Sequence, residues 1–185
     1  MIKRTYPQTR LRRTRAKGFM RDLIAQNNLT TDDLIQPIFI ADQSEDKIEI
    51  PSMPGIHRHN LDSLYSEVES LILAGIKSIA IFPAIDAGKK DEDGSYALDQ
   101  GNIVCLALAG LSERFPDIIK IADVALDPYT DHGHDGLLKD GKVDNDETVK
   151  LLQDQALILA QSGADIIAPS DMMDGRVKAI RDTLE

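Results

Sequence analysis

Residues 123–138 read DVALDPYTDHGHDGLL, with aspartates at every fourth position, Asp123, Asp127, Asp131 and Asp135. A spacing of four suggests one face of a helix, but Pro128 and the two glycines that follow exclude a continuous helix across this stretch. The residues just before it, IIKIA, are apolar and β-branched, which is typical of a buried strand. The sequence therefore predicts a strand over 118–127 that runs directly into a loop.

Side chains alternate along a strand, so Asp123, Ala125 and Asp127 share one face and Val124 and Leu126 the other. The carboxyl end of a strand in a strand–helix protein is where active sites lie. We therefore expect Asp123 and Asp127 to point inward at that end, with Asp135 in the following loop. Two carboxylates meeting in a partly buried site raise each other's pKa.

The rest of the chain alternates strand-like and helix-like patterns, which predicts a parallel α/β sheet. The expected strands are 34–40, 78–84, 118–127 and 164–170, and the expected helices are 61–75, 103–115, 147–163 and 176–185. Gly75 and Gly163 are the expected stops of two helices. Four such units make half of a (β/α)₈ barrel, whose complete form needs about 250 residues. A doubly wound domain is an alternative, but no Gly-rich phosphate fingerprint follows the first strand.

Residues 86–102, DAGKKDEDGSYALDQGN, are polar, and we expect a long loop that takes no part in the core. Loops of this length in a compact domain are usually functional or mobile.

The formal net charge of −10 hides a basic segment, because residues 1–21 hold eight Lys or Arg and no acid. Such an arm on an acidic body is open to several interpretations: nucleic-acid binding, an organelle presequence, a solvated tail, or contact with an acidic neighbouring subunit. The last is favoured, because an acidic body repels nucleic acid. One cysteine, Cys105, and the lack of any long apolar run indicate a cytoplasmic protein without a membrane span.

Several stretches together resemble the porphobilinogen synthase (5-aminolevulinate dehydratase) family. The strongest are DVALDPYTDHGHDG at 123–136 and APSDMMDGRVKAIR at 168–181, supported in the family's order by TRLRRTR, DDLIQPIFI and DEDGSYALDQGNIV. The resemblance implies a TIM barrel, here its first half over 34–185, and an N-terminal arm over 1–33. In the family this arm embraces a neighbouring subunit, and the dimers assemble into octamers.

The resemblance also bears on metals. Zinc-using members carry C-x-C-x₇-C where this chain has Ala125, Asp127 and Asp135, a set of hard oxygens that does not favour zinc. The chain resembles the Asp-rich branch, associated with magnesium or with no active-site metal. Magnesium there is mainly allosteric, with its principal carboxylate expected outside residues 1–185, so no metal ligand is expected here.

The family joins two molecules of 5-aminolevulinate into porphobilinogen with loss of two waters, through two Schiff-base lysines. The blocks that carry those lysines do not occur in this sequence, so we expect the chain by itself to be inactive. Lys120 falls on the outward side of its strand and is expected at the surface. Rival hypotheses are a non-catalytic half-barrel that binds a partner chain and a magnesium-dependent hydrolase using the aspartates.

The resemblance implies the following site residues: Asp123 and Asp127 as active-site carboxylates, Asp135 as a possible closing residue, and Ser170 and Asp171 as supporting groups after the fourth strand. Ser170 and Asp171 have an alternative role in capping the final helix.

Overall fold

Six of the described strands, whose bounds follow, form one mostly parallel sheet in the order β2-β3-β1-β4-β5-β8. A computed structural model describes residues 4–185. The main strands are β1 (Gln36–Ala41), β4 (Ser78–Ala84), β5 (Ile119–Val124) and β8 (Ile166–Pro169). All pair in parallel, and β3 (His57–His59) adds to β1 in parallel with β2 (Lys47–Glu49) antiparallel outside it. The predicted α/β fold is confirmed as a partial barrel; the short β2 and β3 were not expected.

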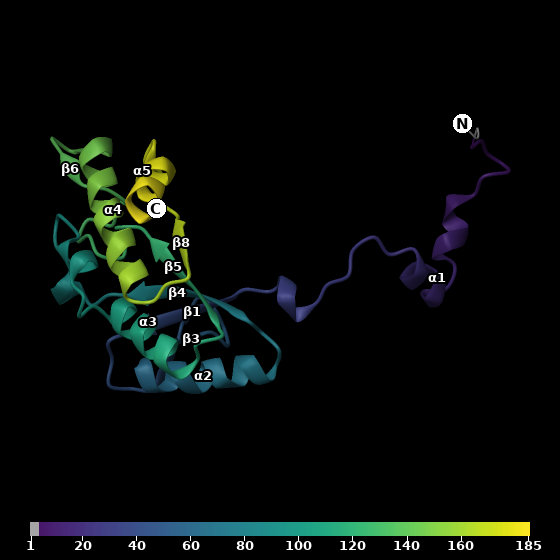
Figure 1. Cartoon of the computed structure of the whole chain (residues 1–185), viewed down its shortest axis with the longest axis horizontal. Helices are drawn as coiled ribbons and strands as arrows, with labels where there is room; N and C mark the ends of the chain where they lie inside the picture. Colours follow the sequence, from purple (N-terminus) through teal and green to yellow (C-terminus); the bar gives the residue numbers. More distant parts are fainter. Residues whose placement is uncertain (1–3) are drawn as a thin grey trace.

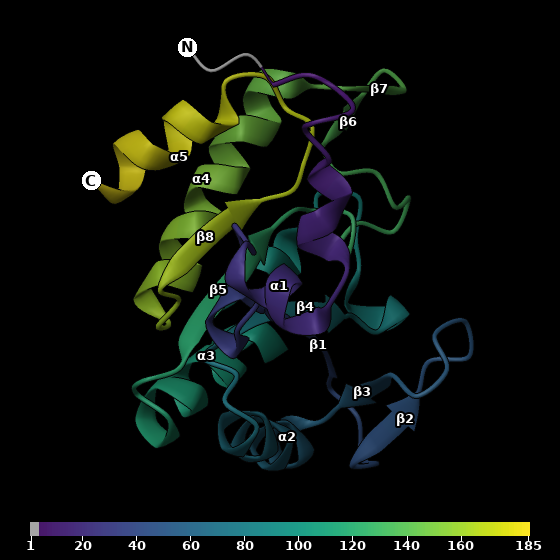
Figure 2. The same cartoon turned by 90° about the vertical axis from the view of Figure 1, so that its right-hand side faces the viewer.

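Helices α2 (Leu61–Leu73), α3 (Ile103–Arg114) and α4 (Asn145–Gln161) cover one face of this sheet (Figures 1 and 2). The helix α5 (Arg176–Leu184) packs on α4. The core between strands and helices consists of fully or almost fully buried side chains, among them Ile38, Ile40, Ile79, Ile81, Leu64, Val68, Leu108, Leu111, Val124, Leu152 and Leu159. Burying each such side chain is worth about 1.5–3 kcal/mol.

Two of the crossover helices end as the sequence predicts. Gly75 and Gly163 follow α2 and α4 with φ of +88° and +111°, a backbone region that glycine adopts without strain. At both ends the next amide closes the cap, Ile76 N–H donating to Leu71 O at 2.9 Å and Ala164 N–H to Leu159 O at 3.1 Å. The chain then turns directly into β4 and β8, so each glycine sets the direction in which the next strand enters the sheet.

Within residues 4–185, no helix packs on the opposite face of the sheet. Its rows contain Phe39 and Phe82, half-buried with ring centroids 5.8 Å apart, and Ile166, which is 47% exposed. In a closed barrel this face would be the interior.

Residues 4–35 extend away from the sheet (Figure 1). They form a 3₁₀ turn (Leu11–Arg15), the short helix α1 (Gly18–Leu23) and a second 3₁₀ turn (Thr31–Asp33) capped by Thr30. Large apolar side chains on this segment are exposed: Leu11, Phe19, Leu23 and Leu29.

Two sequence-based expectations about burial are wrong. Lys120 lies on the outward side of β5, as predicted, but it is only 3% exposed, because helices cover that face. Its Nζ lies 2.8 Å from Asp165 Oδ2 and donates to Ile118 O at 3.1 Å. Residues 86–102 also reach the core, since Ala97 and Asn102 are fully buried there.

Candidate active site

The candidate site lies where β5 and β8 end side by side. Asp123 pairs with Ala168 across the ladder, and Val124 pairs with Pro169. Ser170 follows directly after β8, and its side chain lies close enough to the Asp123 carboxyl to act on its pKa. The expectation that β5 extends to residue 127 is wrong, since the strand ends at Val124 and Asp127 lies in the following turn.

Asp123 is half-buried on the open face of the sheet. Burial raises the pKa of this carboxyl, the Ser170 side chain opposes the rise, and the charges of Asp127 and Asp171 add to it. The raised pKa favours the protonated form of Asp123 at higher pH than for a solvated aspartate.

The charge of Asp135 acts on Asp127 across the loop. Asp127 is exposed and Asp135 is half-buried. The pKa of Asp127 is raised by desolvation and by the negative charge of Asp135, while Lys90 partly offsets both. These two carboxylates are hard oxygen donors whose negative charge a cation would balance. Ala125, at the first position of the C-x-C-x₇-C pattern, offers no donor side chain. The residues therefore do not fit a zinc–thiolate site. Among residues 4–185, no group of three or more His, Cys, Asp or Glu side chains is arranged to hold a metal ion.

Asp171 is 2% exposed, one residue after Ser170, which is itself exposed. Its Oδ1 accepts from Met173 N–H at 2.7 Å, and its Oδ2 lies 3.1 Å from Arg176 Nε. Burial raises the pKa of Asp171 despite the Met173 amide and the Arg176 charge. The side chain thus ties the loop before α5 to Arg176, the first residue of that helix. It does not cap α5, because the N-cap is Gly175 without a side-chain cap hydrogen bond, so the capping role considered from the sequence is wrong.

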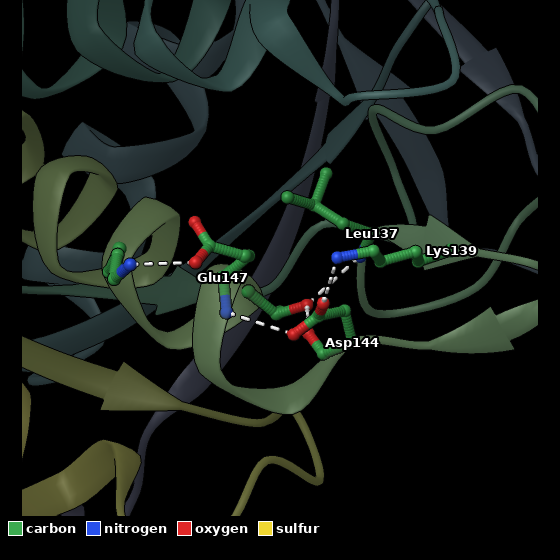
Figure 3. Close-up of polar contacts among 6 residues, drawn as sticks. Leu137, Lys139, Asp144 and Glu147 are labelled. Carbon is green, nitrogen blue, oxygen red and sulfur yellow. Dashed lines mark hydrogen bonds and ion pairs between the residues drawn. The ribbon is translucent and has the colours of Figure 1, made fainter.

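The segment after Asp135 is held against the first turn of α4 (Figure 3). Asp144 caps the helix by accepting from Glu147 N–H at 3.2 Å, and Thr148 Oγ1 accepts from Leu137 N–H at 3.0 Å. Gly136 fits beneath, since a Cβ there would lie 2.8 Å from Thr148 Oγ1. These contacts fix the chain directly after Asp135. A short hairpin of β6 (Leu138–Lys139) and β7 (Lys142–Val143) connects Leu137 to Asp144.

The loop after β4 joins the site through a short parallel bridge between Asp91 and Thr130. Asp131 N–H donates to Asp91 O at 3.0 Å, and His132 Nε2 lies 3.1 Å from Glu92 O. This bridge brings the half-buried Lys90 close enough for its charge to act on Asp127.

Comparisons with known proteins agree with this geometry. The sequence profile of the family described as "Delta-aminolevulinic acid dehydratase" matches residues 8–185. The chain belongs to the delta-aminolevulinic acid dehydratase family. The enzyme of that name from Bradyrhizobium diazoefficiens is 49% identical over 176 residues, which are 95% of this chain and 50% of the relative. That from Chlamydia pneumoniae is 45% identical over 95% of this chain and 53% of its own length.

A solved structure of the family is also similar. The Toxoplasma gondii delta-aminolevulinic acid dehydratase, in complex with the reaction product porphobilinogen, superposes with a TM-score of 0.93 at 42% identity. The match covers 96% of this chain and 51% of that one. This chain thus spans about half the length of the family members it matches.

Four of the five residues singled out from the sequence, the aspartates, lie close enough for their charges to act on one another's pKa. The charges of Asp127 and Asp171 act on Asp123, and that of Asp135 acts on Asp127 and Asp171. Sequence reasoning missed Lys90 and Tyr129. Tyr129 is 2% exposed beneath the loop, and burial raises the pKa of its hydroxyl. Only the non-local bridge at Asp91 and Thr130 reveals the position of Lys90, so no pattern within residues 86–102 identifies it.

Proposed function

We propose that this chain is the N-terminal half of a delta-aminolevulinic acid dehydratase, with residues 1–33 as an arm and 34–185 as the first half of its barrel. The observation that carries the proposal is the gathering of Asp123 and Asp171 with Ser170 at the carboxyl ends of two barrel strands. The similar Toxoplasma gondii enzyme, in complex with porphobilinogen, supports the same conclusion.

The proposed reaction condenses two molecules of 5-aminolevulinate into porphobilinogen and releases two waters. Asp123 and Asp127, whose pKa values are raised, would hold and pass protons beside the reacting carbon and nitrogen atoms. Asp135 would close the site, and Ser170 and Asp171 would support it. Each Schiff base forms when a neutral lysine amine adds to a ketone and expels water. The resemblance places those two lysines outside this chain, so we propose that residues 1–185 alone are catalytically silent.

We further propose that the arm binds a second copy of the protein, as part of a homo-octamer. The exposed Phe19 and Leu23, at 88% and 85%, leave apolar surface on the arm without a cover in one chain. A basic arm also complements an acidic body. A cytoplasmic location and allosteric magnesium, whose main ligand would lie outside residues 1–185, belong to the same proposal. No helix in the described part of the chain is long and apolar enough to cross a membrane.

Borohydride trapping tests the proposal directly. The purified chain is incubated with 5-aminolevulinate, reduced and weighed intact, and we expect no mass gain. The chain is then mixed with a separately expressed second half of the Bradyrhizobium diazoefficiens relative. We expect porphobilinogen to form in the mixture and in neither half alone.

The matched control for the mixture is Asp123→Asn, which should abolish product formation while leaving assembly of the two halves intact. A stoichiometric adduct on a lysine of the isolated chain would refute catalytic silence. A well-assembled mixture that makes no porphobilinogen would refute the proposed function.

A further inference from the structure

The pairing between β5 and β8 ends just before the candidate site. Its last Cα pair is Val124 with Pro169, and Ser170 N–H donates to Val124 O at 3.2 Å. Beyond these positions the backbone of both segments needs other hydrogen-bond partners to keep a fixed conformation. Both segments find such partners on α4.

On the β5 side the partner is Gln155, which is 1% exposed. Its Nε2 donates to Ala125 O at 3.1 Å, between Asp123 and Asp127 in the chain. Its Oε1 is buried without a hydrogen-bond partner among the described residues. A buried unpaired acceptor costs free energy, so this glutamine is poorly explained by packing alone. The hydrogen bond from its Nε2 to Ala125 O explains why a glutamine is present at this position.

On the β8 side the partner is Asn145, at the start of α4. Its Oδ1 accepts from Asp174 N–H at 2.7 Å and its Nδ2 donates to Asp174 O at 3.2 Å, a closed pair of bonds to one peptide residue. The same loop is tied inward, since Asp171 accepts from Met173 N–H and Arg176 Nη1 donates to Met173 O at 2.9 Å. Fixing Asp174 therefore restrains the backbone that carries Asp171.

We propose that Asn145 and Gln155 are positioning residues of the candidate site. Both sit on one helix, ten residues or about 15 Å apart along its axis, so a rigid element sets the separation of the two carboxylate-bearing segments. Neither is in hydrogen-bond contact with a site carboxylate. Their effect on the site passes through the backbone of Ala125 and of Asp174. The expected effect of this restraint on ligand affinity rests on the proposed function, but the restraint itself does not.

Amide hydrogen exchange of this chain, followed by NMR, measures the restraint. Asn145→Ala removes both bonds to Asp174, and we expect the amides of Asp174 and Met173 to exchange about tenfold faster. Asn145→Asp keeps an acceptor for Asp174 N–H and should restore slow exchange there. The control is Gln153→Ala, which removes an amide of the same helix that binds Ala179 O and Thr183 Oγ1 on α5 instead.

Gln155→Met is the reciprocal variant, because methionine fills the volume without donating a hydrogen bond. We expect faster exchange at Tyr129 and Thr130, whose amides close the turn on Leu126 O at 2.8 and 2.9 Å, with no change at Asp174. The proposal is overturned if Asn145→Ala leaves Asp174 protected, if Gln153→Ala loosens it equally, or if Gln155→Met leaves the turn unchanged.

Calorimetric titration with porphobilinogen adds the functional readout. We expect Asn145→Ala to weaken binding about tenfold and Gln153→Ala to leave it unchanged. Equal affinity of the wild type and Asn145→Ala would overturn a positioning role. If the wild-type chain binds no porphobilinogen, the proposed function loses support, and the exchange rates still decide whether Asn145 and Gln155 restrain the two segments.

Discussion

Mutating the two partners of the ion pair between Lys120 and Asp165 should have unequal effects on stability, because the partners differ in exposure. The Lys120 side chain is 3% exposed and that of Asp165 is 48% exposed. Lys120 Nζ also donates to Ile118 O, and its backbone N–H donates to Asp165 Oδ2 at 2.8 Å. Removing the lysine leaves a carboxylate that water can solvate, whereas neutralising the aspartate leaves an ammonium inside the protein.

The expected losses of unfolding free energy follow from that difference. Lys120→Met loses the bond to Ile118 O, gains apolar packing and leaves Asp165 half in water, at a cost of about 1–2 kcal/mol. Asp165→Asn keeps an oxygen for the Lys120 amide but leaves the buried charge without its counterion. We expect about 3 kcal/mol, near the lower end for a broken buried pair, because Ile118 O still accepts from Nζ.

Urea unfolding of the two single variants and the double variant at pH 7 measures these costs, provided the m-value stays constant. The double variant should cost less than the sum of the singles. If Lys120→Met costs as much as Asp165→Asn or more, the argument from unequal exposure is wrong.

The same pair predicts a pH dependence. Burial raises the pKa of Asp165, but the Lys120 side-chain and backbone hydrogen bonds outweigh burial and lower it below its ordinary value of 3.8. A carboxyl whose pKa falls on folding stabilises the protein above its unfolded pKa and loses that contribution as pH falls through the folded value. The difference between wild type and Lys120→Met should therefore narrow below about pH 4.

Three further predictions concern other parts of the chain. Gly110→Ala would place a Cβ into overlap with Tyr65 Oη, and the Tyr65 ring is held under Arg114. We expect this variant to lose about 2 kcal/mol of unfolding free energy in urea, and less in a Tyr65→Ala background. Asn102→Ala removes the buried cap that accepts from Val104 and Cys105 N–H and should lower the free energy of unfolding by about 1–2 kcal/mol, while Asn102→Asp retains most of it. Because folding raises the pKa of Asp123, the contribution of this carboxyl to stability is present below its unfolded pKa and is lost as pH rises through the folded value. The melting temperature of Asp123→Asn, relative to wild type, should therefore be higher at pH 7.5 than at pH 4.5. The control is the exposed Asp154→Asn, whose difference from wild type should not change in this way.

Periodicity predicts the strand and helix order well because each element buries one face against a neighbour along the chain. The glycine stops at 75 and 163 are local as well, since each of these two helix ends turns into its strand through a residue with positive φ. The residue at which β5 ends is not determined by the local sequence. It is set by where pairing with β8 stops, at Pro169, and an apolar run that extends to Leu126 contains no sign of that.

Strand parity correctly identifies the side of the sheet to which Lys120 belongs, yet it does not tell what covers that side. A lysine on an outward face is normally at the surface, but here helices cover the face and Asp165 supplies the countercharge. The polar loop before α3 is similar. Its composition predicts solvent exposure, whereas the bridge from Asp91 to Thr130 and the buried cap at Asn102 fold it onto the core.

The position of Asp123 near the carboxyl end of a strand was predictable from the alternating pattern before it, but its electrostatics depend on the open face of the sheet. Ile166 at 47% exposure and the half-buried Phe39 and Phe82 show that this face is apolar and partly wet. Closing a barrel over it would remove more water from the half-buried Asp123. Desolvation already raises the pKa of Asp123, so closure would raise it further unless it also brought a cation. Under the proposed function, the rest of the barrel brings in a lysine amine, which is such a cation when protonated. Beside a protonated Asp123 this amine more readily becomes the neutral nucleophile that Schiff-base formation requires. The carboxylates of this chain and the amines expected outside it would thus set each other's ionisation, and neither half alone would have the proton balance of the proposed reaction.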